Sequence, residues 1–362
     1  MLFYKWHVLS VVVLYCFYTV NCIIDPLSLG LLATITSMYL WMSENKSSIG
    51  GKVVKYVGQK VGYYEGCEDY WIPSNIHNLE YEMKSAVFGQ PLALDIIISA
   101  MRNHLRTGGE PDKPLMLSFH GSPGTGKNFI AQLILKNMFR MGAKSDYTIF
   151  FRSSIDFPLK SNIDQYKKDI VTKIQEKVYE CHRSIFVFDE VEKMPDGLLE
   201  VLSGFVKIGV NGKFDFRKSI FILLSNIGSD ILLSETLKEV KYNGGFREDI
   251  NAVELGKMLA VSSFNNEGGL QKTGLVKNLC ISYYVPFLPL ESHHVIQCLK
   301  REVARLHQVM SAELVDQVLE AITFKPEWLP VFSAGGCKGI REIAEMLIER
   351  ELRRKRKLEH NT

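Results

Sequence analysis

Three uninterrupted apolar runs mark the central part of the chain. They lie within Leu115–His120, 183–190 and 219–224, and each is followed by glycine or polar residues. Runs of this length without alternation are typical of parallel strands that are buried on both faces. Stretches with helical periodicity, such as 129–140, lie between them. Residues 82–285 therefore predict an α/β domain in which helices flank a doubly wound sheet.

The pattern changes at the prolines Pro286 and Pro289. Beyond them, apolar positions recur with helical spacing in three segments, 291–307, 311–324 and 339–357. Because prolines interrupt regular structure, a domain boundary is expected here. We predict that residues 286–362 form a small all-α C-terminal domain.

The N-terminal region is apolar for a different reason. Residues 8–20 form a continuous apolar stretch behind a lysine, as in a secretory signal, and we assign 1–22 to a signal peptide. Residues 23–43 are a second hydrophobic segment, at the lower limit of what spans a bilayer. A proline, a glycine and several hydroxyl residues in it favour a membrane-associating helix in the membrane plane, with a spanning helix as the alternative. Residues 44–81 are interpreted as a linker.

A glycine-rich loop follows the first apolar run and precedes a helix. Backbone N–H groups of such a loop surround phosphate oxygens, and the helix N-terminus adds positive charge. Lys127 is expected to neutralise the β- and γ-phosphates of ATP. Asn128 stands where Ser or Thr normally offers Mg²⁺ a hydroxyl, and its amide oxygen can still face the metal or its water. The residues assigned to nucleotide binding are Gly121, Ser122, Pro123, Gly124, Thr125, Gly126, Lys127 and Asn128, together with Asp189.

Two carboxylates, Asp189 and Glu190, end the second apolar run. In an open α/β sheet the carboxyl ends of the strands face the ligand crevice. We therefore expect Asp189 to hold Mg²⁺ largely through water, and Glu190 to polarise the attacking water. The third run is followed by Asn226, whose amide can orient water against the γ-phosphate. The pattern predicts an ATP hydrolase that uses ATP and Mg²⁺.

Charge and cysteine usage add constraints. The net charge of +3 in 362 residues provides no electrostatic reason to expect nucleic acid as a partner. Of seven cysteines, two lie in the predicted leader, which leaves an odd number for an oxidising compartment. Cys67 has no clear role, and Cys181 and Cys280 are interpreted as inert buried thiols. No spacing indicates zinc, and His293 and His294 are interpreted as helix surface.

These motifs together resemble a Clp-type AAA+ ATPase module and, within that group, the torsin family. Four features support the narrower resemblance: Asn128 after the loop lysine, the leader with its membrane-associating segment, the run Ser-Ser-Phe-Asn-Asn at 262–266, and Lys338 in a Gly-Cys-Lys triplet where most relatives carry Gly-x-Arg. The resemblance covers roughly 88–338. It implies that 121–128 is the Walker A loop and that Asp189 and Glu190 are the Walker B pair.

The resemblance also implies roles for other residues. Asn226 would be the sensor one residue and Lys338 the sensor two cation that reaches the γ-phosphate. Cys298 and Cys337 occupy the positions of a redox-sensitive pair in the family.

Two departures from the Clp pattern bear on activity. Leu279 stands where Clp-type enzymes carry an arginine finger, whose loss costs ~10³ to 10⁵ in rate. The segment 153–166 lacks the aromatic-glycine pore loop that unfoldases use to grip a threaded chain. The chain is therefore expected to hydrolyse ATP weakly by itself, and a simple threading unfoldase is the least favoured function. If the finger role falls to another cation of this chain, Arg247 is the first candidate.

Torsins act in the endoplasmic reticulum lumen and the perinuclear space of the nuclear envelope. The resemblance implies activation by the lumenal AAA-like domain of a single-span membrane protein, within a homo- or hetero-oligomeric ring or filament. It also implies ATP-dependent remodelling of protein or membrane assemblies in the nuclear envelope, the nuclear pore and the endoplasmic reticulum. The alternative is a nucleotide-gated oligomeric scaffold or chaperone-like binding protein with little turnover.

Overall fold

The computed structural model describes residues 64–106 and 110–359. The predicted signal peptide, the membrane-associating segment and most of the linker lie outside the described residues. Within the described part of the chain, no helix is both long and apolar enough to cross a bilayer.

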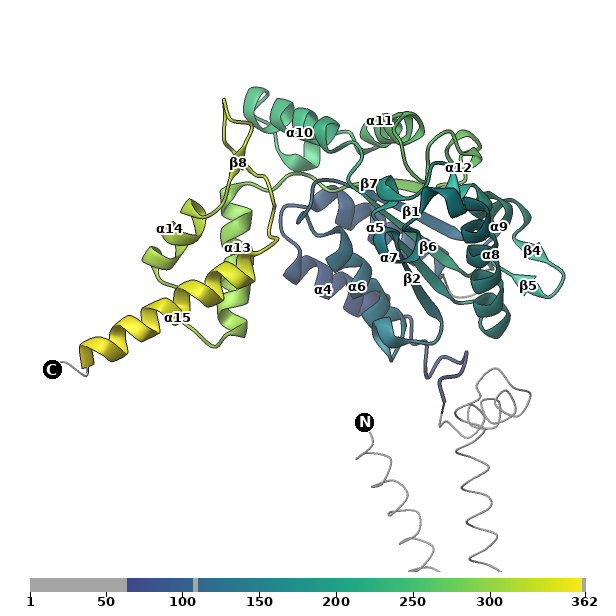
Figure 1. The fold of residues 1–362 in the computed structure, drawn as a ribbon, viewed down its shortest axis with the longest axis horizontal. Coiled ribbons are helices and arrows are strands. Elements are labelled where there is room, and N and C mark those ends of the chain that lie inside the picture. The colour runs from purple at the N-terminus through teal and green to yellow at the C-terminus, as the bar shows by residue number, and fades with distance from the viewer. Residues whose placement is uncertain (1–63, 107–109, 360–362) are drawn as a thin grey trace, which may run out of the picture. The chain divides into compact units, whose positions relative to one another are not determined.

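A five-stranded parallel sheet forms the centre of the fold, with the strand order β2-β3-β6-β1-β7 (Figure 1). In register, Leu115 of β1 pairs with Ile220 of β6, and Ile185 of β3 pairs with Ile220 from the other side. All residues of β1 and β6 are buried, as the uninterrupted apolar runs predict. The strands span Leu115–His120 (β1), Thr148–Arg152 (β2), Ile185–Asp189 (β3), Ile220–Ser225 (β6) and Tyr283–Pro286 (β7).

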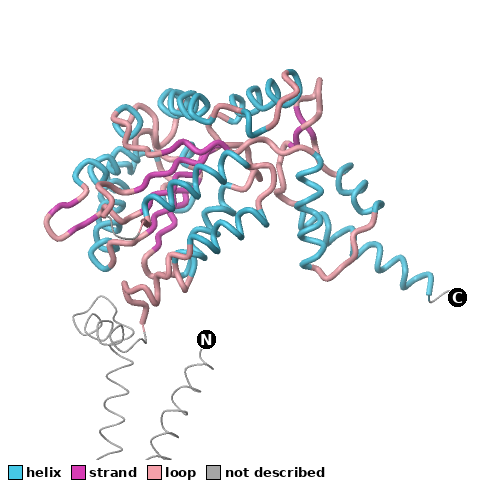
Figure 2. Tube along the Cα trace, turned by 180° about the vertical axis from the view of Figure 1, so that it is seen from behind, coloured by secondary structure: helices cyan, strands magenta, loops and turns pink. Residues whose placement is uncertain are grey.

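Successive strand residues point to opposite faces of the sheet, so each face has its own core. Leu117 and Phe119 pack on one side with α4 (Ile76–Ala86), α5 (Pro91–His104) and α6 (Lys127–Met138). Met116 packs on the other side with α8 (Ile163–Glu180), α9 (Leu202–Ile208) and α12 (Gly274–Lys277). Figure 2 shows the strands enclosed between these helices.

Local sequence signals start several helices. The Asn75 side chain accepts a hydrogen bond from Asn78 N and caps α4, and Pro91 occupies the first turn of α5. Asn251 caps α11. Helix α4 begins before residue 82, so the predicted boundary between linker and domain falls inside a helix. The remaining elements before β7 are α7 (Ser153–Asp156), the hairpin β4 (Val210–Asn211) and β5 (Phe214–Asp215), α10 (Ser229–Leu237) and α11 (Ala252–Asn265).

The C-terminal region is helical and has a separate apolar core. Helices α13 (Ser292–Arg305), α14 (Ala312–Glu320) and α15 (Ile340–Glu359) pack around residues such as Leu299 and Ala344. A short hairpin of β8 (Phe324–Lys325) and β9 (Phe332–Ser333), which the sequence pattern did not predict, connects α14 to α15. The fold is the predicted parallel α/β sheet followed by a helical C-terminal region.

One cysteine assignment is wrong. Cys181 is not an inert thiol, because it forms a disulfide with Cys67, with the two Cα atoms 5.4 Å apart. The bond joins the end of α8 to the segment before α4. The Arg183 guanidinium donates to the Cys67 carbonyl oxygen and to Asp69, both at 2.6 Å, and so holds the same segment. Cys280 is buried and takes part in neither disulfide of the described residues.

Candidate nucleotide site

The glycine-rich loop lies between β1 and α6, at the carboxyl end of the central sheet. Gly126 adopts a left-handed conformation (φ 108°), and α6 begins at the next residue. Gly124 also has positive φ, and a Cβ on it would lie 1.8 Å from the carbonyl oxygen of Gly335, so no larger residue fits. The N-terminus of α6 therefore opens onto the loop, as an anion site requires.

Lys127 points back across the loop. Its ammonium donates to the carbonyl oxygens of Gly121 and Ser122 and to the Asn226 side-chain oxygen. Burial lowers the pKa of Lys127 to about 8, although the charges of Glu192 and Asp189 oppose the shift. The structure thus brings the predicted phosphate-binding lysine and Asn226 into direct contact.

The two predicted carboxylates lie at the end of β3. Burial raises the pKa of Asp189, and the charge of Glu190 adds to the rise. Such a carboxyl gains from a nearby cation, and a carboxylate with an amide oxygen is a donor set that suits Mg²⁺. Asp189 and Asn128 both line the same cavity, so they fit the predicted metal role. Among residues 64–106 and 110–359, no group of three or more acids, cysteines or histidines forms a protein-only metal site.

Glu190 has a left-handed backbone (φ 58°) and pairs with the Lys193 ammonium at 2.5 Å. Glu192, two residues further on, accepts hydrogen bonds from the backbone N–H of Asn226 and, at 2.6 Å, from its side-chain amide. The sequence analysis assigned no role to Glu192. The only signal in the sequence is its position two residues after the second Walker B acid. It fixes the amide so that the oxygen of Asn226 faces Lys127.

The C-terminal region closes over the loop. The N–H of Cys337 donates to the Gly124 carbonyl at 3.0 Å, and the next residue, Lys338, lines the cavity. Cys337 forms a disulfide with Cys298 of α13, with the Cα atoms 6.2 Å apart. The two cysteines implied by the resemblance are therefore bonded to each other beside the phosphate loop.

A cavity of about 590 Å³ unites these groups, a size typical of small-ligand sites. Its polar lining includes Lys127, Asp189, Glu190, Asn226 and Lys338. Lys127 begins α6, Asp189 and Glu190 lie at the end of β3, Asn226 follows β6, and Lys338 precedes α15. The cavity can hold a nucleoside triphosphate with its phosphates on the loop.

Gln90 is a further residue that sequence reasoning missed. Its buried amide donates to the carbonyl oxygens of Thr125 (3.1 Å) and Leu288 (2.8 Å), and its oxygen accepts from Leu288 N at 2.7 Å. It thereby joins the phosphate loop to the segment that leads into α13. Its partners lie 35 and 198 residues away, so no local pattern marks them.

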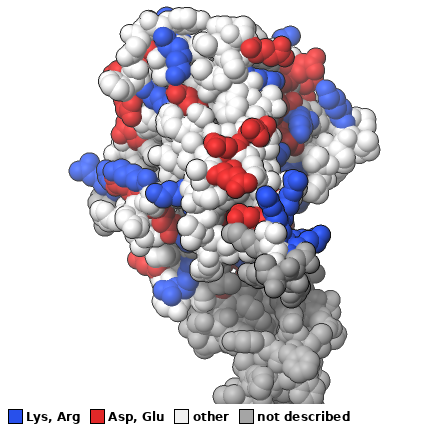
Figure 3. Space-filling view, turned by 90° about the vertical axis from the view of Figure 1, so that its left-hand side faces the viewer, with Lys and Arg blue, Asp and Glu red and all other residues white. Residues whose placement is uncertain are grey.

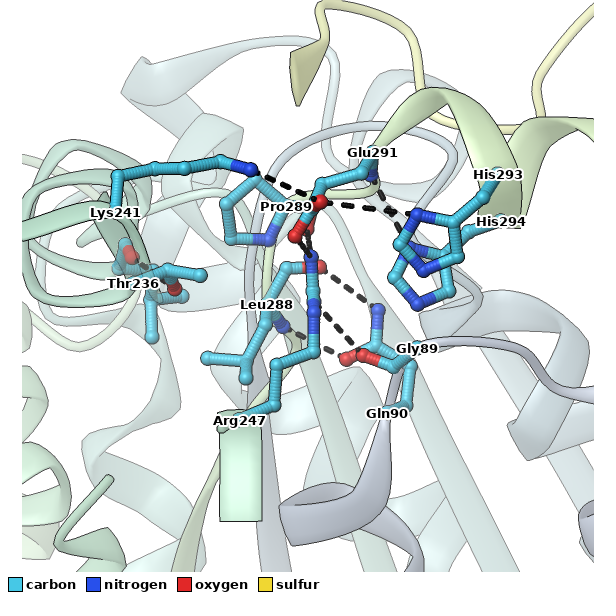
Figure 4. A network of polar contacts seen from close by, with 11 residues as sticks. Gly89, Gln90, Thr236, Lys241, Arg247, Leu288, Pro289, Glu291, His293 and His294 are labelled. Carbon is cyan, nitrogen blue, oxygen red and sulfur yellow. Dashed lines mark hydrogen bonds and ion pairs between the residues drawn. The ribbon is translucent and has the colours of Figure 1, made fainter. Parts of the chain in front are cut away.

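Arg247 does not fit the role of a substitute finger. It is 8% exposed and donates to the carbonyl oxygens of Gly89 and Pro289 and to Glu291 (Figure 4). It does not line the cavity. His294 lies in the same network and is buried, so its interpretation as helix surface is wrong.

Comparison with known proteins identifies the family. The Torsin family model matches residues 61–188, and the model of the Torsin-1A C-terminal domain matches 290–345. A Torsin-like protein of Drosophila melanogaster is 34% identical over 292 residues, covering 79% of this chain and 85% of the relative. One of Caenorhabditis elegans is 36% identical over 283 residues, covering 76% and 78%.

The chain belongs to the torsin family. The resemblance drawn from the motifs is confirmed. Among solved structures, the S. cerevisiae Hsp104-ADP complex matches with a TM-score of 0.54 at 18% identity, over 79% of this chain and 49% of that one. The likeness shows an AAA+ fold, and the chain spans about half the length of that relative.

The torsin fold places Leu279 at the surface. It lies two residues after α12, is 79% exposed and has a left-handed backbone (φ 53°). It lies outside the lining of the nucleotide cavity. The side chain at the expected finger position is therefore apolar, exposed and not part of this chain's own site.

Proposed function

We propose that this torsin-family protein binds Mg²⁺ and ATP in the cavity and hydrolyses ATP. The observation that carries the proposal is the convergence of Lys127, Asp189, Glu190 and Asn226 on one cavity, from the start of α6 and the ends of β3 and β6. Lys127 binds the β- and γ-phosphates, and Glu190 polarises the attacking water. Asn226 orients that water, and Lys338 contacts the γ-phosphate. Bound Mg²⁺, held by Asp189 and Asn128, supplies charge neutralisation of the phosphates.

Two variants test these assignments. Lys127→Ala removes the phosphate cation and is expected to abolish ATP binding, measured by calorimetry on the full chain. Glu190→Gln keeps the shape of the site and removes the base, so it is expected to bind ATP normally, to lose turnover and to retain partners longer. If Glu190→Gln hydrolyses ATP as fast as the unmodified chain, Glu190 is not the base.

We further propose that the protein acts in the endoplasmic reticulum lumen and the nuclear envelope and depends on an activator. The support for the location is membership of the torsin family. The support for the activator is that Leu279, at the finger position, is apolar and exposed, and that Arg247 is buried and bonded within its own chain. A partner of the AAA-like lumenal class, carried by a single-span membrane protein, supplies an arginine in a mixed ring or filament. The activity then remodels protein or membrane assemblies.

The turnover of the chain alone and with such a lumenal domain separates the two function classes. For an activator-dependent ATPase, turnover rises by about 10³ or more with the partner and falls back when the partner's arginine becomes alanine. A nucleotide-gated scaffold or chaperone-like protein assembles with ATP but shows no such rise. Fast turnover by the chain alone contradicts activator dependence.

We also propose a regulatory role for the Cys298–Cys337 disulfide. It ties α13 to the residue before Lys338, beside the Gly124 carbonyl. Reduction frees the Gly335–Cys337 turn and therefore changes the ATP affinity. The measurement is ATP titration with and without reductant, with peptide mapping of the thiols; an affinity that ignores reductant removes the idea.

A further inference from the structure

The cations that line the cavity differ in their partners. Arg305 pairs with Glu302 at 3.1 Å, and Arg341 pairs with Glu345 at 2.8 Å. Arg301 also lines the cavity, but no carboxylate pairs with it among the described residues. A guanidinium without an acidic partner, placed in a binding cavity, is available to a ligand.

Arg301 is held in place by the ATPase domain. One N–H group donates to the carbonyl oxygen of Ala86, at the end of α4, at 3.1 Å. The guanidinium carbon lies 4.7 Å from the centroid of the Phe129 ring, which is two residues after Lys127 on α6. A planar cation over an aromatic ring is a stable arrangement that leaves its second face for another flat group.

The cavity also has an apolar part. Val87 and Phe88 follow the hydrogen-bond partner of Arg301, and Cys298 lies one helical turn before it on α13; the charged lining residues of α13 and α15 include the pairing residues Glu302 and Arg305. The polar residues assigned to the phosphates and the metal are Lys127, Asp189, Asn226 and Lys338. Because a nucleotide has its base at the end opposite the γ-phosphate, the apolar part is left for the base.

We propose that Arg301 binds the adenine base of ATP, with Phe129 supporting the guanidinium from behind. This inference rests on the proposed ATP binding and adds a binding residue that belongs to the C-terminal region rather than to the phosphate loop. The contact gives affinity for the base, and the bound base adds to the contacts that Arg301 already makes with the end of α4 and the start of α6.

The test compares a ligand with a base and one without it. ATP and inorganic tripolyphosphate are titrated by calorimetry into the full chain and into the Arg301→Met and Arg301→Lys variants. Loss of a desolvated cation–π contact is expected to weaken ATP binding by roughly 5- to 30-fold in Arg301→Met. Arg301→Lys is expected to recover little, because lysine lacks the planar group. Tripolyphosphate affinity is expected to stay within about 2-fold.

Lys300→Met is the matched control, since it removes one positive charge from an exposed position of the same helix that lies outside the cavity lining. It is expected to leave ATP affinity nearly unchanged. Phe129→Leu provides an independent variant, which is expected to weaken the binding of ATP but not of tripolyphosphate. Thermal unfolding checks that each variant is folded.

Equal losses of affinity for both ligands in Arg301→Met would place Arg301 on the phosphates and overturn the proposal. Unchanged ATP affinity in Arg301→Met would also overturn the proposal and would leave Arg301 with only a structural role between the two domains. Failure of the unmodified chain to bind ATP would instead overturn the proposed function, and this assignment with it.

Discussion

The positive charge of the ligand-free site lies on the buried ammonium of Lys127. Lys127 donates to two carbonyl oxygens of its own loop and to Asn226, and burial lowers its pKa to about 8. Burial disfavours the charged ammonium more than the nearby carboxylates of Glu192 and Asp189 favour it. A bound triphosphate supplies the missing negative charge, so it raises this pKa.

Proton uptake on binding is the measurable consequence. With a pKa of about 8, Lys127 is expected to lack its proton in about half of the free molecules at pH 8, and nucleotide binding is expected to restore it because the complex favours the charged form. We expect MgATP binding to take up about half a proton near pH 8 and less near pH 6.5, and the affinity to fall as pH rises above 8. Calorimetry in buffers of different ionisation enthalpy measures the uptake.

The exposed Lys257→Met variant is the control for this experiment and should behave as the unmodified chain. An uptake near zero at every pH from 7 to 9 would mean that Lys127 is fully charged before ATP arrives.

At the scale of the elements, the sequence was most informative about the sheet. The three continuous apolar runs became β1, β3 and β6, because parallel strands covered on both faces need apolar residues throughout. The residues after these runs then had to meet at one edge, and the nucleotide cavity is there. The continuous apolar runs and the residues at their ends were therefore enough to predict that Asp189 and Asn226 lie close to Lys127.

Contacts between distant segments were beyond the sequence. The Cys67–Cys181 bond joins residues 114 apart, and several pairings of the cysteines were equally compatible with composition. Gln90 belongs to the site because it bonds to Thr125 and Leu288, and Arg301 lines the cavity because α13 packs against the ATPase domain. No periodicity encodes where a second domain packs, so these residues became visible only in three dimensions.

The segment that leads into α13 is held by contacts of this kind. The buried side chains of Gln90 and Arg247, which are distant in sequence, both bond to it (Figure 4). Gln90 contacts Leu288, while Arg247 contacts Pro289 and the Glu291 carboxylate. Since Gln90 also bonds to Thr125 in the phosphate loop, we expect movement of that loop to reach this segment. The segment that connects the two domains is then expected to respond to nucleotide.

Gln90→Leu tests this coupling. It leaves two carbonyl oxygens and one N–H group buried without the amide, and each lost partner costs about 1 to 3 kcal/mol of unfolding free energy. We expect the variant to be less stable in chemical denaturation and, under conditions where it is folded, to bind ATP more weakly. The exposed Gln165→Leu on α8 is the control. Unchanged ATP affinity in folded Gln90→Leu would limit Gln90 to a structural role.

At the scale of the whole molecule, Figure 3 shows Lys and Arg interspersed with Asp and Glu on the face drawn there. The two disulfides, by contrast, are placed at different functional positions. Cys298–Cys337 borders the nucleotide cavity, whereas neither Cys67 nor Cys181 lines it.

The two bonds are therefore expected to fail in different ways. Replacing Cys67 and Cys181 by serine opens a long loop, which typically costs about 2 to 5 kcal/mol of unfolding free energy because the unfolded chain gains freedom. ATP affinity of the folded variant is expected to stay unchanged.

Replacing Cys298 and Cys337 by serine alters the turn that lies on Gly124 and is expected to change ATP affinity. Chemical denaturation and ATP titration of both double variants, made side by side, measure the two effects. Loss of ATP affinity in the folded variant without Cys67 and Cys181 would contradict this expectation. It would show that the Cys67–Cys181 bond affects the nucleotide cavity through the central sheet, although neither cysteine lines the cavity.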